Sequence, residues 1–378
     1  MLGEQAPPAY TTNASLEEIA DWLRGLSSLV VLTHAKPDGD AMGASLGLVR
    51  AMNLSRGGTA KGVSGAASVA EAWYAGAVPF WARAIVRQTK HRLLEPPAEG
   101  EPRRTAPSSL DPDGIVIVDT GAWGQLADFA EFLRPRTARA VVIDHHLAGD
   151  ADVAARRYVD TSAAAACEIV AELCRILLGV RKLTDLPADV AEPLYLGICT
   201  DTGWFRHSNV SPRVMRVAAD LLETGVKPGP LYETVEQGDR PERLKLLRRA
   251  LDSLEFHDDD RFVVMTLRRQ DFTETGAAPG DSGGFHEIVK TVATVRVSVL
   301  LTETPGDDGR PVTKVSMRSK SAVAGAAPGD GLIDVNEISR TLGGGGHRQA
   351  AGARVNADAE TTKRLVLDAL RRAAGLSS

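Results

Sequence analysis

Aspartate and histidine residues follow four short apolar segments of the chain, at spacings that would suit metal ligation. The motifs are THAKPDGDAMG (33–43), VDTG (118–121), VIDHH (142–146) and GICTDTGWF (197–205), and their acidic and imidazole side chains are His34, Asp38, Asp40, Asp119, Asp144, His145, His146 and Asp201. Aspartate and histidine are suitable ligands for Mn²⁺, Mg²⁺, Fe²⁺ or Co²⁺. The three cysteines form no CxxC pair, which argues against a zinc site built from thiolates.

The charge of these motifs predicts two metal ions rather than one. Four of the carboxylates would repel one another if they met without a cation, namely those of Asp38, Asp40, Asp119 and Asp201. Two divalent cations would balance the four charges and leave positions open for water and a phosphate, as in two-metal phosphoryl-transfer sites. Any one of these motifs alone could instead be a solvated turn or a helix cap. The metal prediction therefore depends on all four motifs occurring together in this order.

The elements needed to position these motifs are those of an α/β domain with a parallel sheet. The segments SLVVLTH (28–34), GIVIVDTG (114–121) and ARAVVIDHH (138–146) are typical of buried strands, and helical patterns lie between and after them. Ligands bind at the carboxyl ends of the strands in such sheets, where these motifs lie. Residues 55–113 show no clean period, and we expect helix and no function in EAWYAGAVPFWARAIVRQTKHRLL (71–94).

A second pattern of strands and helices begins near residue 255. We predict a metal-bearing domain over 1–230, a helical connector over 231–254 and a smaller α/β domain over 255–378. The smaller domain has a hairpin of TVRVSVLLTET and PVTKVSMRSK, a helix in DVNEISRTL, the glycine-rich segment GGGGHRQAAG and a terminal helix.

The glycine-rich segment has two interpretations. Consecutive glycines could form a nest of backbone N–H groups for an anion, or the segment could be a flexible surface loop. Alternation places Ser316, Arg318 and Lys320 on one face of their strand, which is either a substrate-facing stripe or a solvated edge. Mainly because the chain resembles a known family, we favour substrate binding, to a terminal phosphate or base, by Arg318, Gly344, Gly345, Gly346 and His347.

Composition limits the classes of partner and the compartment. The net charge of −5 disfavours binding to long duplex nucleic acid, because neutralising phosphates needs a basic surplus. No apolar run approaches the ~20 residues of a membrane span, and the start of the chain lacks the pattern of a signal peptide. Few, unpaired cysteines are typical of a reducing compartment, so we expect a cytoplasmic protein without a membrane partner.

The four motifs together resemble those of the DHH phosphoesterases, and GGGGHRQAAG resembles the hallmark loop of the associated C-terminal domain. The resemblance implies that His34 and Asp38 hold a first metal ion, that Asp119 bridges, and that Asp40, His145 and Asp201 hold a second. It also implies that Asp144 orients the histidines and that His146 points to the substrate phosphate or leaving group. The chain departs from the family at Gly43-Ala44, where Gly-Ser is common, and over 55–113, which lack the usual strand and helix.

Within that family the chain is most similar to phosphodiesterases of short oligonucleotides, the nano-RNases that also dephosphorylate adenosine 3′,5′-bisphosphate. The resemblance implies a phosphoric ester hydrolase with two divalent ions, Mn²⁺ favoured over Mg²⁺ or Co²⁺, and a short oligoribonucleotide bound between the domains. A homodimer is one option for its assembly. A cyclic di-AMP phosphodiesterase is an alternative with the same metals, and an inorganic pyrophosphatase would not need GGGGHRQAAG. A catalytically inactive binding module would have no need of six retained ligands.

Overall fold

The structure is a computed structural model of the 378-residue chain, in which two compact units can be described separately. The first is Met1–Gly238 and the second is Asp239–Ser378. The described residues are 9–57, 69–94, 110–306, 310–321 and 331–376.

The first unit is built on a six-stranded parallel sheet, which confirms the predicted α/β class. Its order is β3-β2-β1-β4-β5-β6, with the bounds β1 (Leu29–Leu32), β2 (Ala70–Ala75), β3 (His91–Leu94), β4 (Gly114–Val118), β5 (Ala140–Asp144) and β6 (Arg156–Val159). The strand order reverses between β1 and β4. In open parallel sheets the crevice for ligands lies at such a switch point, beyond the carboxyl ends of the strands.

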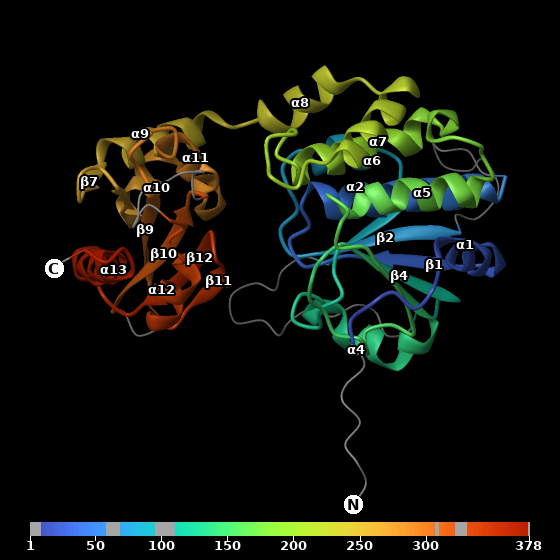
Figure 1. The fold of residues 1–378 in the computed structure, drawn as a ribbon, viewed down its shortest axis with the longest axis horizontal. Helices are drawn as coiled ribbons and strands as arrows, with labels where there is room; N and C mark the ends of the chain where they lie inside the picture. The colour runs from blue at the N-terminus through green and yellow to red at the C-terminus, as the bar shows by residue number, and fades with distance from the viewer. Residues whose placement is uncertain (1–8, 58–68, 95–109, 307–309, 322–330, 377–378) are drawn as a thin grey trace, which may run out of the picture. The chain divides into compact units, whose positions relative to one another are not determined.

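Helices cover both faces of this sheet, which explains why its central strands are apolar throughout. The larger layer contains α1 (Leu16–Gly25), α2 (Gly39–Ser55), α5 (Ala166–Leu178), α6 (Ala188–Asp201), α7 (Pro212–Glu223) and α8 (Pro228–Glu236) (Figure 1). Val31 and Val116 pack toward that layer, whereas Val30 and Ile115 pack toward α4 (Ala130–Leu133) on the opposite face (Figure 1).

The expectation for residues 55–113 is wrong where the structure describes them. In place of one helix, β2 and β3 extend the sheet beyond β1, with the short α3 (Ala82–Val86) between them. Trp73 and Tyr74 are both buried, on opposite faces of β2. A strand covered on both faces shows no alternation of polar and apolar residues, so its period is hidden in the sequence. Residues 58–68 and 95–109 lie outside the described ranges.

The second unit has a six-stranded sheet in which β8 and β9 are parallel and the other pairs antiparallel. The order is β11-β12-β10-β9-β8-β7, with the bounds β7 (Glu255–His257), β8 (Phe262–Leu267), β9 (Val297–Pro305), β10 (Pro311–Ser319), β11 (Gly345–His347) and β12 (Ala350–Val355). β9 and β10 form the predicted hairpin. Residues 307–309 of its turn are not among those described.

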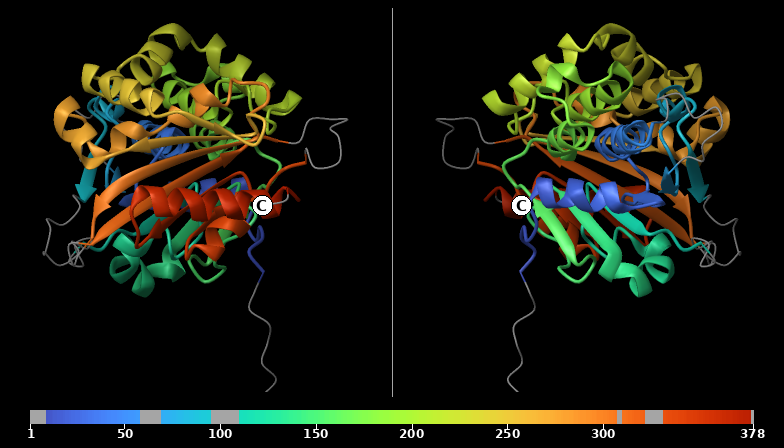
Figure 2. Two further views of the ribbon diagram at one scale, coloured as in Figure 1. Left: turned by 90° about the vertical axis from the view of Figure 1, so that its left-hand side faces the viewer. Right: turned by 90° about the vertical axis from the view of Figure 1, so that its right-hand side faces the viewer.

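Helices cover both faces of this second sheet as well. One face carries α9 (Pro241–Asp252), α10 (Arg269–Thr275) and α11 (Phe285–Val289). The other carries α12 (Val335–Thr341) and α13 (Ala359–Ala373), drawn in red in Figure 2.

The division between the two units falls inside the range 231–254 that the sequence assigns to a connector. α8 belongs to the first unit, whereas Leu246 and Ala250 of α9 are buried with Val263 and Met265 of the second. The amphipathic pattern of α9 therefore reflects packing on the second sheet. Among the described residues, no helix combines the length and apolar composition required to cross a membrane.

Candidate metal centre

The first motif forms the turn between β1 and α2 and places its carboxylates by capping the helix. Asp38 is the N-cap of α2, and its Oδ1 accepts hydrogen bonds from the amides of Asp40 and Ala41, both at 3.1 Å. An aspartate here satisfies amides that have no partner inside the helix. His34, on the other side of the turn, has its Nε2 at 3.7 Å from Asp38 Oδ1.

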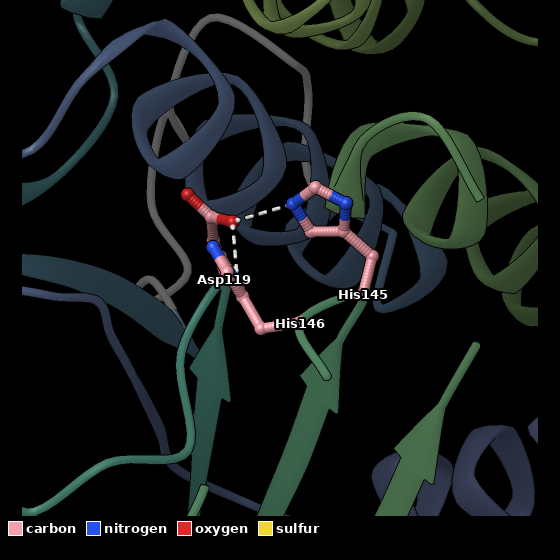
Figure 3. Close-up of side chains that lie close together, drawn as sticks. All are labelled: Asp119, His145 and His146. Atoms are coloured by element: carbon pink, nitrogen blue, oxygen red, sulfur yellow. Dashed lines mark ion pairs between the residues drawn. The ribbon is translucent and has the colours of Figure 1, made fainter. Parts of the chain in front are cut away.

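Asp119 lies at the centre of the candidate site. It follows β4 with a φ of 62°, an unusual backbone conformation for a residue other than glycine and one that is concentrated at functional sites. Its Oδ2 is 3.3 Å from His34 Nε2, and its Oδ1 is 3.3 Å from His145 Nε2. Figure 3 shows its carboxylate facing His145 and His146, which follow the neighbouring strand β5. Within the described residues, its buried Oδ1 makes no hydrogen bond.

Asp40 is held by the N-terminus of another helix. Its carboxylate is buried and accepts the amide N–H of Ala166 at 2.6 Å and of Cys167 at 2.9 Å, where α5 begins. His145 Nε2 lies 3.7 Å from Asp40 Oδ2 and 3.9 Å from an oxygen of Asp201, the last residue of α6. The side chains on this side of the site are therefore positioned by α2, α5, α6 and the end of β5.

The structure brings all six predicted metal ligands together. The described residues form three groups whose potential ligand atoms lie within 4.8 Å of one another: His34, Asp38 and Asp119; Asp40, His145 and Asp201; and Asp119, His145 and His146. The third group shares Asp119 with the first and His145 with the second, so the three adjoin. Two of them are the ligand sets that the family resemblance implies, but the role of each residue as a ligand stays a prediction.

The electrostatics of the site favour a divalent cation. Burial and the charges of Asp119 and Asp201 raise the pKa of Asp40, and burial with neighbouring carboxylates raises that of Asp201 to about 6. Burial lowers the pKa of His34, but the nearby carboxylates of Asp119 and Asp38 outweigh it and raise the value to about 10. The raised pKa values mean that, without metal, protons on these side chains offset the negative charge of the carboxylates. Divalent cations would supply that positive charge instead. Together with the buried Asp119 Oδ1, which accepts no hydrogen bond from the described residues, and the set of oxygen and imidazole ligand atoms, this fits divalent metal ions.

Asp144 forms a hydrogen-bonded pair with His146, which is the member of the third group that is not a predicted metal ligand. Asp144 is fully buried, and its Oδ1 accepts the amides of His145 at 2.8 Å and His146 at 3.2 Å. The same oxygen lies 2.7 Å from His146 Nδ1, while 47% of the His146 side chain is exposed. This hydrogen bond raises the pKa of His146. The geometry is that of a carboxylate that orients an accessible imidazole; the family resemblance implies this role for Asp144, and it stays a prediction.

One contact to Asp144 was not predicted. Tyr10, near the start of the chain, has its hydroxyl 2.5 Å from Asp144 Oδ2 and donates a hydrogen bond to it. Tyr10 belongs to none of the four motifs and follows no strand, so its sequence context carries no signal for this contact.

In the second unit, the predicted Arg318 lies next to a buried histidine. His286 Nδ1 is 2.8 Å from Ser298 Oγ, its Nε2 is 3.2 Å from Ser316 Oγ, and Arg318 Nη1 donates to the same Ser316 oxygen at 3.4 Å. Burial, with the charges of Arg318 and Lys290, lowers the pKa of His286 to about 3. A neutral imidazole thus lies beneath the half-buried guanidinium.

The glycine-rich segment differs from both of its predicted forms, because it is a β-hairpin. β11 pairs with β12 in the register Gly345 to Gly352, and the Gly344 amide donates to Ser339 O at 2.8 Å, so that amide is not free for an anion. A Cβ on Gly344 or Gly346 would come closer than 3.0 Å to the backbone of β12. Glycine is therefore needed here for close approach of the two strands. His347 is exposed at the end of β11.

Comparison with known proteins gives matches over both units. The DHH family N-terminal domain matches residues 28–198, and the DHHA1 domain matches residues 259–375. A "Bifunctional oligoribonuclease and PAP phosphatase NrnA" of Thermus thermophilus is 31% identical over 375 residues, covering 98% of this chain and 97% of the relative. The "Cyclic-di-AMP phosphodiesterase GdpP" of Geobacillus thermodenitrificans is 24% identical over 94% of this chain and 49% of its own.

Among solved structures, an exopolyphosphatase-related protein from Bacteroides fragilis superposes with a TM-score of 0.76 at 20% identity. The match covers 95% of this chain and 96% of that one. It shows that the two chains share a fold.

Proposed function

This chain belongs to the DHH family and carries its DHHA1 domain, and from that premise we propose that it hydrolyses short oligoribonucleotides and adenosine 3′,5′-bisphosphate. The chain is a phosphoric ester hydrolase of that family. The observation that carries the choice of substrate is the similarity to the Thermus oligoribonuclease and PAP phosphatase, because it extends over both units and nearly the whole of both chains. The six clustered side chains support metal-dependent hydrolysis of a phosphoric ester, whichever of these substrates is used, because they could hold two divalent ions.

The proposed cofactor is a pair of divalent ions, with Mn²⁺ favoured. His34 and Asp38 would hold one ion, Asp40, His145 and Asp201 the other, and Asp119 would contact both, because it adjoins both groups. When bound, the ions would neutralise the negative charge that develops on the phosphoryl oxygens.

The proposed mechanism gives His146 the part of proton donor. Asp144 holds Nδ1 of His146, which leaves Nε2 as the ring nitrogen available to a substrate. Water attacks the phosphorus and releases one proton to the solvent, the bond from phosphorus to the leaving oxygen breaks, and that oxygen takes a proton from His146 Nε2. Asp144 stays ionised and holds the imidazole in one orientation, which favours transfer from the protonated ring.

The second unit would bind the nucleotide portion of the substrate. Arg318 offers a half-buried guanidinium whose orientation is supported by Ser316, and His347 offers an exposed imidazole on the hairpin. Of the three predicted glycines, Gly344 and Gly346 face the backbone of β12, whereas the space beside Gly345 is more open and would let a phosphate or base approach the hairpin. A cytoplasmic location is consistent with the three cysteines, which are free, buried thiols. Assembly as a homodimer stays a prediction from the sequence.

Cyclic di-AMP is a second candidate substrate, which the relative from Geobacillus supports. It would use the same six side chains, so only comparison of substrates separates the two. Inorganic pyrophosphate is less favoured, because its hydrolysis offers no role for the nucleotide-binding groups of the second unit.

The test is an assay with added Mn²⁺ that compares a diribonucleotide, adenosine 3′,5′-bisphosphate, cyclic di-AMP and pyrophosphate, each with and without EDTA. We expect hydrolysis of the first two, abolished by EDTA, and a loss of at least about 100-fold in Asp119→Asn. Asp21→Asn removes an exposed carboxylate of α1 and should retain full activity. Hydrolysis of pyrophosphate alone, or full activity of Asp119→Asn, would overturn the proposal.

A further inference from the structure

Residues 9–15 precede the region matched by the DHH family and lie along the edge strand β6. Thr12 Oγ1 accepts the amide of Val159 and donates to its carbonyl, both at 2.8 Å. The Asn13 amide donates to Arg157 O at 2.9 Å, and its side-chain oxygen accepts the Arg157 amide at 2.7 Å. These contacts attach the start of the described chain to the sheet that carries the metal centre.

The ring of Tyr10 enters this sheet between two glycines. Gly121 follows β4 and Gly149 follows β5, and a Cβ on either would come closer than 3.0 Å to atoms of the Tyr10 ring. Neither glycine has a φ that requires glycine, so the tyrosine itself explains why no side chain is tolerated there. Tyr10 therefore occupies a formed cradle at the carboxyl ends of β4 and β5.

The Tyr10 hydroxyl completes the hydrogen bonding of Asp144. Asp144 Oδ1 forms hydrogen bonds with His146 Nδ1 and two backbone amides, and Oδ2 accepts a hydrogen bond from the Tyr10 hydroxyl at 2.5 Å. We propose that Tyr10 is a positioning residue, which fixes the Asp144 carboxylate and thereby the imidazole of His146. The inference rests on the proposed function only in giving His146 a part in catalysis.

Removing the Tyr10 hydroxyl would remove the hydrogen bond to Asp144 Oδ2 on which the proposal depends. Rotation of a carboxylate about χ2 meets only a broad, shallow preference, so hydrogen bonds must set its plane. Without Tyr10 Oη, Asp144 Oδ2 is left buried with no donor, and the carboxylate is favoured to rotate toward another partner. The His146 ring would then lose its fixed orientation. Tyr10 contacts none of the six proposed metal ligands through a hydrogen bond, so metal affinity should not change.

The test compares Tyr10→Phe with Tyr74→Phe, which removes a more deeply buried hydroxyl of the same unit, bonded to Ser45 Oγ at 2.8 Å. We expect Tyr10→Phe to lower kcat about 10-fold, as loss of a supporting hydrogen bond does in related sites, with KM and the Mn²⁺ dependence unchanged. Gly121→Ala, which displaces the Tyr10 ring, should lower kcat in the same way. Tyr74→Phe should retain the kcat of the parent protein.

A second measurement does not depend on activity. In the metal-free protein, the ¹⁵N resonances of the His146 ring should shift in Tyr10→Phe and stay in place in Tyr74→Phe. A kcat and His146 resonances that match those of the Tyr74→Phe protein would overturn the inference. If the parent protein hydrolyses none of the nucleotides tested, the proposed function fails, and the resonances still decide whether Tyr10 positions His146.

Discussion

Gly197 provides a test of the packing that holds Asp40. It lies inside α6, where a Cβ would come closer than 3.0 Å to Cys167 Sγ of α5 and to 3.0 Å from Asp40 Oδ1 of α2. Alanine in place of glycine inside a helix normally adds about 1 kcal/mol of stability. Overpacking a core removes about 1–3 kcal/mol. Because all three helices are fixed to the same sheet and cannot move apart, we expect the overpacking cost to be about 3 kcal/mol, the upper end of that range. After subtraction of the helix gain of about 1 kcal/mol, Gly197→Ala should lower the free energy of unfolding by about 2 kcal/mol.

The design allows a rescue by a second substitution. Cys167→Ala removes the sulfur that the new methyl group would strike. In the double variant Gly197→Ala/Cys167→Ala, the new methyl group at position 197 therefore takes the space that the sulfur leaves. We expect the two substitutions to be coupled by at least about 1 kcal/mol in a double-mutant cycle. Gly43→Ala should gain less from Cys167→Ala, because its Cβ would also strike the carbonyl oxygen of Pro193, which is backbone.

The assay is denaturant unfolding of each variant, together with a Mn²⁺ titration that reports displacement of Asp40. Gly229→Ala in α8 is the control, since no atom lies within 4 Å of the added Cβ, and it should be neutral or slightly stabilising. The reasoning is refuted if Gly197→Ala is as stable as Gly229→Ala, or if the cycle shows no coupling.

Two further predictions concern metal and pH. Mn²⁺ at 100 times its dissociation constant should raise the unfolding free energy of the first unit by about 2.7 kcal/mol for each bound ion, or about 5.4 kcal/mol for the proposed pair. Thermal unfolding against an EDTA-treated sample measures this gain, and His34→Ala should reduce it. Burial and the charges of Arg318 and Lys290 lower the pKa of His286 to about 3, so below pH ~6.5 the unfolded chain binds a proton there that the folded chain does not. Stability of the second unit should therefore fall with pH below this value, by about 2 kcal/mol at pH 5, in urea unfolding. His286→Gln should remove this part of the pH dependence, and an identical dependence in the variant would contradict the assignment.

The chemistry-bearing residues of the first unit could be predicted because each lies beside a local signal. His34, Asp119 and Asp144 come at or just after short apolar segments, and parallel strands bring their carboxyl ends to one edge. The cap position of Asp38 follows from the turn residues Pro37 and Gly39 beside it. Patterns only a few residues long were therefore enough to predict the fold class, the edge of the sheet and the set of candidate ligands.

Local patterns failed where burial on both faces or close strand approach decided the structure. β2 shows no alternation because Trp73 and Tyr74 are both covered, and GGGGHRQAAG forms a hairpin because its glycines allow β11 to approach β12. In both cases the neighbouring element supplies the constraint, so the segment alone does not reveal it.

The amino-acid sequence by itself determined which side chains are candidates for the chemistry of this protein and at which edge of a parallel sheet they gather. Only the tertiary structure decided how they are supported: α5 donates its first amides to Asp40, Gly197 admits Cys167, and Tyr10 reaches Asp144 across 134 positions of sequence. The physical reason is one of range. Strand ends, turns and caps follow from neighbours in the chain, whereas a hydrogen bond or a close contact between distant residues exists only once the elements have packed.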